Sequence, residues 1–290
     1  MTRGLGGPCW DFASRDPNHA KGSSPRRDTE AARRLLTASR GGYLDLRGHV
    51  ALRTDRIVID ADVEPVKERP GRSDALGGHV GLEVAAALLM RPGRPTAVRG
   101  LARELGRSAG TVSEILAALR RDELVDANNA VTDTRLFWEL AERWQTPRTN
   151  LARAPEPSDL AKAGPLRLGL DDVEHTSGWA LTESAAAAAY GAPLAFRADQ
   201  VLDFFVPDHS VVRRATTLLG AAGTASSARA TVRVAPVPAA VQRRVELAGN
   251  PLGWPLAHPL FVALDLALDV GRGREVLDSW TPEERWSRVW

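Results

Sequence analysis

The sequence predicts an α+β protein in which a compact helical domain is followed by a mixed α/β domain. Between Pro95 and Val125, two apolar patterns of helical spacing are separated by a tight turn. From residue 165 to residue 290, helical patterns alternate with short runs typical of strands. A chain of 290 residues is long enough for two such domains, each with its own core.

The stretch from Pro95 to Val125 predicts two short amphipathic helices. The first apolar face repeats at i, i+3, i+4 and i+7 and comprises Val98, Leu101, Ala102 and Leu105. A turn follows, in which Gly106 can take a positive φ and Ser108 can cap the next helix. The second apolar face comprises Val112, Ile115, Leu116 and Leu119. Two helices joined by so tight a turn form a helix-turn-helix, whose second helix enters the DNA major groove.

The outward side chains of the second helix agree with that interpretation. They are mostly short and polar near the helix N-terminus, and we expect five of them to face base edges: Arg107, Ser108, Thr111, Ser113 and Glu114. Short side chains allow the backbone to lie close to bases and phosphates. The alternative is a helical hairpin that serves only packing.

Positive charge is concentrated in the same stretch. Residues 91–121 contain seven arginines and two acids, whereas the whole chain has a net charge of only +2. Arginines beside a groove-reading helix neutralise phosphates and release counterions. We expect four of them to contact phosphates: Arg99, Arg103, Arg120 and Arg121. An ordinary solvated face is the alternative.

Residues 124–132 predict a short hairpin behind the second helix, since asparagine tolerates the positive φ of tight turns. We expect Asn128 and Asn129, at its tip, to touch the minor groove or the backbone. The stretch resembles the winged helix-turn-helix domains of bacterial transcription regulators in three motifs: Leu101-Ala102, the hexapeptide Ser108 to Ser113, and Leu124-Val125. The resemblance implies DNA binding without indicating the DNA sequence.

The remaining chain divides by composition. We expect a disordered lead at 1–38, a small β-rich segment at 39–78, the winged domain at 79–145, a linker at 146–164 and an α/β accessory domain at 165–290. Within the winged domain, 80–90 predicts a first helix. Asp133 can cap a later helix, whose apolar stripe is Phe137, Leu140 and Trp144. That stripe either packs against the winged domain or forms a dimerisation or interdomain helix.

The accessory domain predicts helices at 179–190, 209–219, 260–270 and 272–280, and strands at 201–207 and 230–237. Its motifs DFFVP, VRVAP and HPLFVALDLA resemble the AbiEi-type antitoxins and related actinobacterial regulators. That resemblance covers residues 80–280 and implies a C-terminal domain similar to a degenerate nucleotidyltransferase. It further implies repression of a promoter by the winged domain, with the second domain serving dimerisation, partner contact or ligand sensing.

An enzyme, either a nucleotidyltransferase or a nuclease targeted by the winged domain, is the alternative function. Nucleotidyl transfer needs paired carboxylates that hold Mg²⁺ and a Gly-Ser turn for phosphate. Asp203 is followed by two phenylalanines rather than a second acid, and no Gly-Ser turn precedes it. Asp60, Asp62, Glu64 and Lys67 lack the Glu-x-Lys pairing of restriction-type nucleases, so we interpret them as a solvated strand end and loop. We therefore expect no catalytic residues, no metal and no cofactor.

Two further groups are interpreted as structural. Asp265 and Asp269 share one helix face, and we expect ion pairs with Arg272 and Arg274. The C-terminal tryptophans could line a ligand pocket but are expected as core and interface anchors; they are Trp179, Trp254, Trp280, Trp286 and Trp290.

The sequence as a whole predicts a cytoplasmic DNA-binding transcription regulator, a repressor or antitoxin-like autoregulator. Cys9 is the only cysteine, so an internal disulfide is excluded. No apolar run approaches a membrane span, and no signal peptide is expected. The expected partners are double-stranded DNA and a second copy of the chain, with a protein or small-molecule effector on the C-terminal domain.

Overall fold

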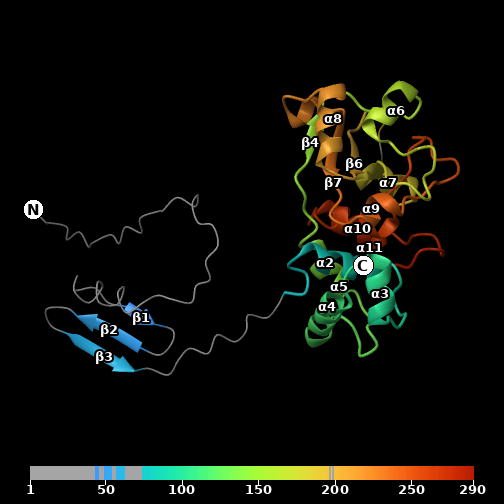
Figure 1. Ribbon diagram of the computed structural model, residues 1–290. Coiled ribbons are helices and arrows are strands. Elements are labelled where there is room, and N and C mark those ends of the chain that lie inside the picture. The colour runs from blue at the N-terminus through green and yellow to red at the C-terminus, as the bar shows by residue number, and fades with distance from the viewer. Residues whose placement is uncertain (1–42, 46–48, 54–56, 63–73, 196, 198) are drawn as a thin grey trace, which may run out of the picture. The chain divides into compact units, whose positions relative to one another are not determined.

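The computed structural model describes residues 43–45, 49–53, 57–62, 74–195, 197 and 199–290. The chain divides into two units, Met1–Arg72 and Ser73–Trp290 (Figure 1). The predicted lead at 1–38 lies outside the described residues, as do Glu64 and Lys67.

The first unit contains a small antiparallel sheet. Its strands are β1 (Tyr43–Asp45), β2 (His49–Arg53) and β3 (Val58–Asp62), in the order β1-β2-β3. Short strands were expected between residues 41 and 60, and these are confirmed. β3 is an edge strand whose apolar side chains are exposed, 63% at Val58 and 41% at Ile59.

The second unit begins with four helices. They are α2 (His79–Leu89), α3 (Val98–Leu105), α4 (Ala109–Arg121) and α5 (Arg135–Ala141). The helical spacing of the sequence therefore placed each of them to within a few residues. Their inner faces meet in one core, in which Leu88, Leu101, Leu116 and Phe137 are at most 2% exposed.

Residues 124–132 form a compact loop that contains no β-strand, in contrast to the predicted hairpin. The loop is closed by a hydrogen bond of 3.0 Å from the Asp126 N–H to the Ala130 carbonyl. Asp126 Oδ1 accepts two further backbone N–H groups, at 2.8 Å from Asn128 and 2.7 Å from Ala130. Such side-chain bonds offer the backbone an alternative to a strand ladder. Two backbone bonds from Gly93 and Thr96 then attach the loop to the segment before α3.

The rest of the second unit is built on a mixed four-stranded sheet in the order β4-β7-β6-β5. Its strands are β4 (Thr149–Leu151), β5 (Ala180–Thr182), β6 (Leu202–Val206) and β7 (Ala230–Val234). β6 and β7 are parallel, and α8 (His209–Leu219) connects them; the outer pairs are antiparallel. The remaining helices are α6 (Leu160–Leu166), α7 (Glu183–Ala189), α9 (Ala239–Gln242), α10 (Pro259–Leu266) and α11 (Arg272–Ser279), with a 3₁₀ turn at Ala225–Ser227. The mixed sheet and these helices confirm the predicted α+β class.

Two segments differ from the sequence prediction. The expected linker contributes β4 to the sheet and the first residues of α6. The helix expected from Trp179 to Tyr190 begins instead as β5, and α7 starts only at Glu183, whose φ is 57°. Residues 180–182 pair with β6, and that tertiary pairing overrides their local preference.

The helical part and the sheet domain share a continuous hydrophobic core. The Trp144 ring stacks on Phe261 of α10, with 5.6 Å between ring centroids and 2° between planes. Phe137, Leu140 and Trp144 are all 0% exposed, so the stripe after α4 packs within the unit. Trp179, Trp254, Trp280 and Trp290 are also buried, as expected of core anchors, and Trp286 is partly buried. Among the described residues, no helix has the length and apolarity needed to span a membrane.

Candidate nucleic-acid interface

The N-terminus of α4 has the geometry that the sequence predicted. Gly106 ends α3 in the left-handed region at φ 63°, where a side chain would be strained. Ser108 then caps α4, because its Oγ accepts the Thr111 N–H at 3.0 Å. The Ser108 and Thr111 hydroxyls also lie 2.8 Å apart, so both are held at the helix end.

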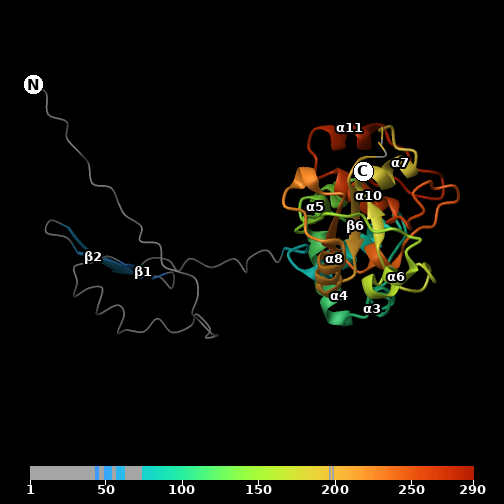
Figure 2. The same ribbon diagram turned by 90° about the horizontal axis from the view of Figure 1, so that it is seen from above.

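The outward face of α4 is exposed along its length. The exposed residues recur at helical spacing and comprise Gly110, Ser113, Glu114, Ala117 and Arg121. The opposite face, with Val112, Leu116 and Leu119, is completely buried. Figure 1 shows α4 at the end of the Ser73–Trp290 unit farthest from α6 and α8, and Figure 2 shows α3 and α4 on the side opposite α7 and α11. No described element of this unit therefore covers the outward face of α4.

Arg107 is bound to α2 rather than projecting freely. Its Nε and Nη2 donate to the Glu83 carboxylate at 2.9 Å and 2.7 Å. The Glu83 side chain is 7% exposed, whereas that of Arg107 is 41% exposed. The pair fixes the turn between α3 and α4 to α2, so Arg107 acts first as a positioning residue.

Asn129 is also engaged within the protein. Its φ is 60°, as expected of an asparagine in a tight turn, but the residue is only 8% exposed. Asn129 Nδ2 donates to the Thr96 carbonyl at 2.8 Å, and Arg120 donates to Asn129 Oδ1. These bonds join α4, the loop and the segment before α3, which leaves Asn128 as the exposed asparagine of the loop.

The other arginines of the helix-turn-helix lie in three places. Arg94 and Arg99 are exposed before and at the start of α3, and Arg121 is exposed at the end of α4, 3.2 Å from Asp122. Arg103 is exposed too, but it lines a cleft between α3 and α9.

A second group of polar side chains lies inside the sheet domain. Asp265 of α10 is buried beside Arg233 of β7, with which it forms an ion pair. Thr182 Oγ1 and Trp144 Nε1 donate to its two carboxylate oxygens at 2.5 Å and 2.9 Å. The predicted pairing of Asp265 with Arg272 and Arg274 is therefore wrong, because the carboxylate points inward to β7. Arg274 instead lies 4.1 Å above the centre of the Trp138 ring.

Glu183 and Asp203 stand at the edge of this group and share Arg148. Arg148 forms an ion pair with Glu183, and its Nη1 lies 3.8 Å from Asp203 Oδ1, which also accepts from Thr231. Burial, together with the nearby charges of Asp265 and Asp203, raises the pKa of Glu183 to about 7 despite Arg148. Two arginines, Arg148 and Arg233, thus pair with the three acids of this group. Among the described residues, no set of three or more His, Cys, Asp or Glu side chains is arranged to hold a metal ion.

Sequence reasoning missed the partners of several functional side chains. Glu83 is the one acid in the mostly apolar α2, and such a residue signals a cation partner. Thr96 and Arg243 carry no comparable signal, because their contacts depend on the packing of segments far apart in the chain.

Comparisons with family models, with curated proteins and with solved structures gave no match for this chain.

Proposed function

We propose that this protein is a sequence-specific DNA-binding transcription regulator, which reads the major groove with α4. The observation that carries the proposal is the exposed, small and polar outward face of α4 next to a capped helix N-terminus. A helix of this kind fits the major groove, and its N-terminus favours an anion. The sequence resemblance to winged helix-turn-helix regulators and AbiEi-type antitoxins supports the same function.

The proposed roles follow the exposure of each side chain. Ser108, Thr111, Ser113 and Glu114 face base edges, while Arg99 and Arg121 contact phosphates. Asn128 contacts the backbone or the minor groove beside the loop. Arg107, Arg120 and Asn129 hold α4 and the loop in position through the bonds described above.

A dimer suits this mode of reading. Two copies would place their α4 helices about one helical turn apart, ~34 Å, on a pseudo-palindromic site. Occupation of such a site within a promoter would repress transcription, and a site in the protein's own promoter would give autoregulation.

Selection from a random library of duplexes tests the proposal, because it assumes no particular operator sequence. The full chain is expected to enrich a pseudo-palindromic sequence, and fluorescence anisotropy should then show tighter binding to it than to random DNA. Raising the salt concentration should weaken both, because counterion release drives the phosphate contacts.

Paired variants separate the two kinds of contact. Glu114→Ala and Ser113→Ala should lower the preference for the selected site, whereas Arg121→Ala should weaken binding to every duplex and reduce the salt slope by about one. Arg213→Ala is the matched control, because Arg213 is an exposed arginine of α8, far from α4 in Figure 1. Failure to enrich any sequence, or equal losses in the Arg121 and Arg213 variants, would contradict the proposal.

A further inference from the structure

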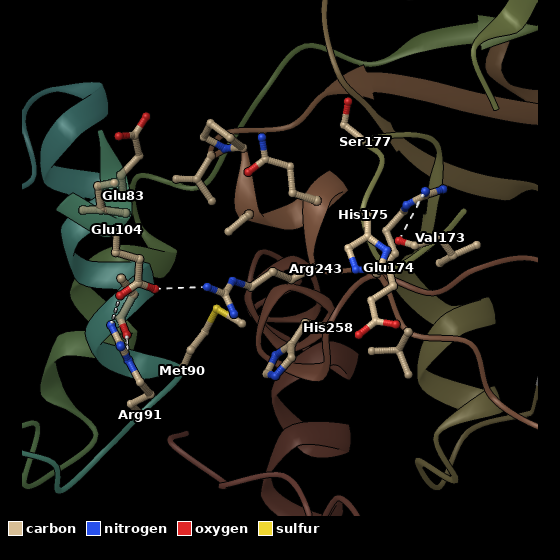
Figure 3. Close-up of a pocket in the computed structure, with 18 of the residues that line it drawn as sticks. Glu83, Met90, Arg91, Glu104, Val173, Glu174, His175, Ser177, Arg243 and His258 are labelled. Carbon is tan, nitrogen blue, oxygen red and sulfur yellow. Dashed lines mark hydrogen bonds and ion pairs between the residues drawn. The ribbon is translucent and has the colours of Figure 1, made fainter. Parts of the chain in front are cut away.

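A cleft of about 1440 Å³ separates the helix-turn-helix from the sheet domain within the second unit. One wall consists of α2 and α3, and the other consists of α9 and the loop 173–177 (Figure 3). Each wall belongs to a different functional part, so a molecule in the cleft would contact both.

Arginines dominate the charged lining of the cleft. Six of them face four acids: Arg91, Arg103, Arg107, Arg243, Arg244 and Arg285 against Glu83, Glu104, Glu174 and Glu246. Arg244 is committed to the protein itself, since it donates to backbone carbonyls, including those of Gly169 at 2.7 Å and Thr176 at 2.8 Å. Arg107 is similarly committed to Glu83. Arg285 is paired with Glu283, at 2.9 Å between Nε and Oε2. Arg91, Arg103 and Arg243 remain as the cations that a ligand can reach, and two of them already bind Glu104.

Glu104 of α3 lies between two of these arginines. Its Oε2 is 2.8 Å from Nη2 of Arg91, and its Oε1 is 3.1 Å from Nη2 of Arg243. Arg243 reaches from α9 across the cleft to make this contact, as the dashed line in Figure 3 shows. Two guanidinium groups that converge on one carboxylate form an anion site whose present occupant is the protein's own side chain.

The remaining lining suits the organic part of a small molecule. Met90, Leu105, Val245 and Trp286 supply apolar surface. The His258 ring lies 4.6 Å from that of Trp286, nearly perpendicular to it. Burial, with a smaller effect of Arg243, lowers the pKa of His258 to about 4, so its ring is neutral at pH 7 and adds no charge to the site.

We propose that this cleft binds a small organic molecule with several phosphate or carboxylate groups, which displaces Glu104 from Arg91 and Arg243. The Glu104 side chain is 29% exposed, that of Arg91 37% and that of Arg243 56%. Ion pairs exposed to this degree are weak, so a multivalent anion can replace the single carboxylate. Arg103, exposed on the same wall, offers a further cation.

Binding would also change the link between the two parts of the unit. The Glu104–Arg243 ion pair joins α3 to α9, and α3 packs against α4. An anion that occupies Arg243 removes this link and biases the position of α4. This consequence rests on the proposed function and makes the anion an effector of DNA binding.

Isothermal titration calorimetry of the full chain tests the site directly, with sodium pyrophosphate and sodium citrate as probes and sodium chloride of equal ionic strength as the control. Binding of either probe supports the proposal, and the preferred probe tells phosphate from carboxylate chemistry. Arg243→Gln should weaken binding about tenfold, because it removes a charged donor. Glu104→Gln should tighten binding about threefold, because it removes the competing carboxylate.

The matched control is Arg213→Gln, which removes the same charge from the exposed face of α8 and should leave the affinity unchanged. The proposal is overturned if neither probe binds beyond the chloride control, or if the Glu104 and Arg243 variants bind as the unaltered chain does.

Circular dichroism of each variant establishes that it is folded. Calorimetry involves no DNA, so its outcome is independent of the proposed function. A selected duplex added afterwards shows whether the bound anion changes DNA affinity.

Discussion

Arg107 and Glu83 form a bidentate ion pair, in which the Nε–Oε2 distance is 2.9 Å and the Nη2–Oε1 distance is 2.7 Å. The pair joins the turn before α4 to the middle of α2. Because Glu83 is only 7% exposed, the negative charge of its carboxylate depends on Arg107 for a compensating positive charge.

Removal of Arg107 should therefore lower stability. Arg107→Ala leaves a buried carboxylate without its partner, which costs about 1–3 kcal/mol in the free energy of unfolding. In a Glu83→Gln background, the same change should cost much less. Urea denaturation of the two single variants and the double variant measures this coupling, and Arg103→Ala serves as the control for an exposed arginine of the same region. Additive effects would show that the pair contributes nothing to stability.

The cap of α4 gives a second prediction. Ser108→Ala removes the acceptor of the Thr111 N–H and should cost about 1 kcal/mol. Ser113→Ala is the matched control, because Ser113 is exposed inside the same helix and alanine is the better helix former. In thermal unfolding, the midpoint temperature should be lower for the Ser108 variant alone. Equal midpoint temperatures for both variants would contradict the capping role.

Asp265 and Asp269 offer a similar contrast within the sheet domain. Asp265→Asn should cost about 3–5 kcal/mol, because it leaves Arg233, which is 2% exposed, without a counter-charge. Asp269→Asn should cost less than about 1 kcal/mol, because Asp269 is exposed and its carboxylate accepts the Gly271 N–H, at 3.1 Å, from a residue two positions away. Urea denaturation of the two variants measures the difference, and a small loss for Asp265→Asn would show that Arg233 finds other compensation.

These two aspartates also show where sequence reasoning stops. Helical spacing correctly predicted α3, α4 and α8, since a continuous apolar face depends only on local order. The cap at Ser108 and the positive φ of Gly106 were equally local and are confirmed. The partner of Asp265 is not set by local sequence: Asp265 lies 32 positions from Arg233 along the chain, and the packing of α10 against the sheet brings them together.

The candidate interface shows the same division. The helical spacing of the apolar residues predicted which side of α4 faces outward, and the exposure of that side agrees with the prediction. The inward turn of Asn129 toward Arg120 and Thr96 did not follow, because it depends on the loop docking against the segment before α3. β4 was missed because three residues carry too little pattern to be distinguished from a linker.

Glu183 and His258 give opposite pH dependences, and this contrast makes a fourth prediction. The pKa of Glu183 is raised to about 7 in the folded protein, from an unfolded value near 4.5. Between these values the folded state holds a proton that the unfolded state has lost, so stability falls as pH rises. His258 behaves in reverse, because its folded pKa of about 4 lies below its unfolded value of 6.5. Between those values the unfolded state holds the extra proton, so stability rises with pH.

The two effects largely cancel in the unaltered chain, and single variants should reveal each one. The unfolding free energy of Glu183→Gln, minus that of the unaltered chain, should rise between about pH 4.5 and pH 7 by on the order of 3 kcal/mol at most. The same difference for His258→Gln should fall between about pH 4 and pH 6.5. Urea denaturation at half-unit pH intervals gives both curves. A flat curve for Glu183→Gln would mean that Arg148 keeps the Glu183 carboxylate ionised, because its ion pair would then outweigh the burial that raises the pKa.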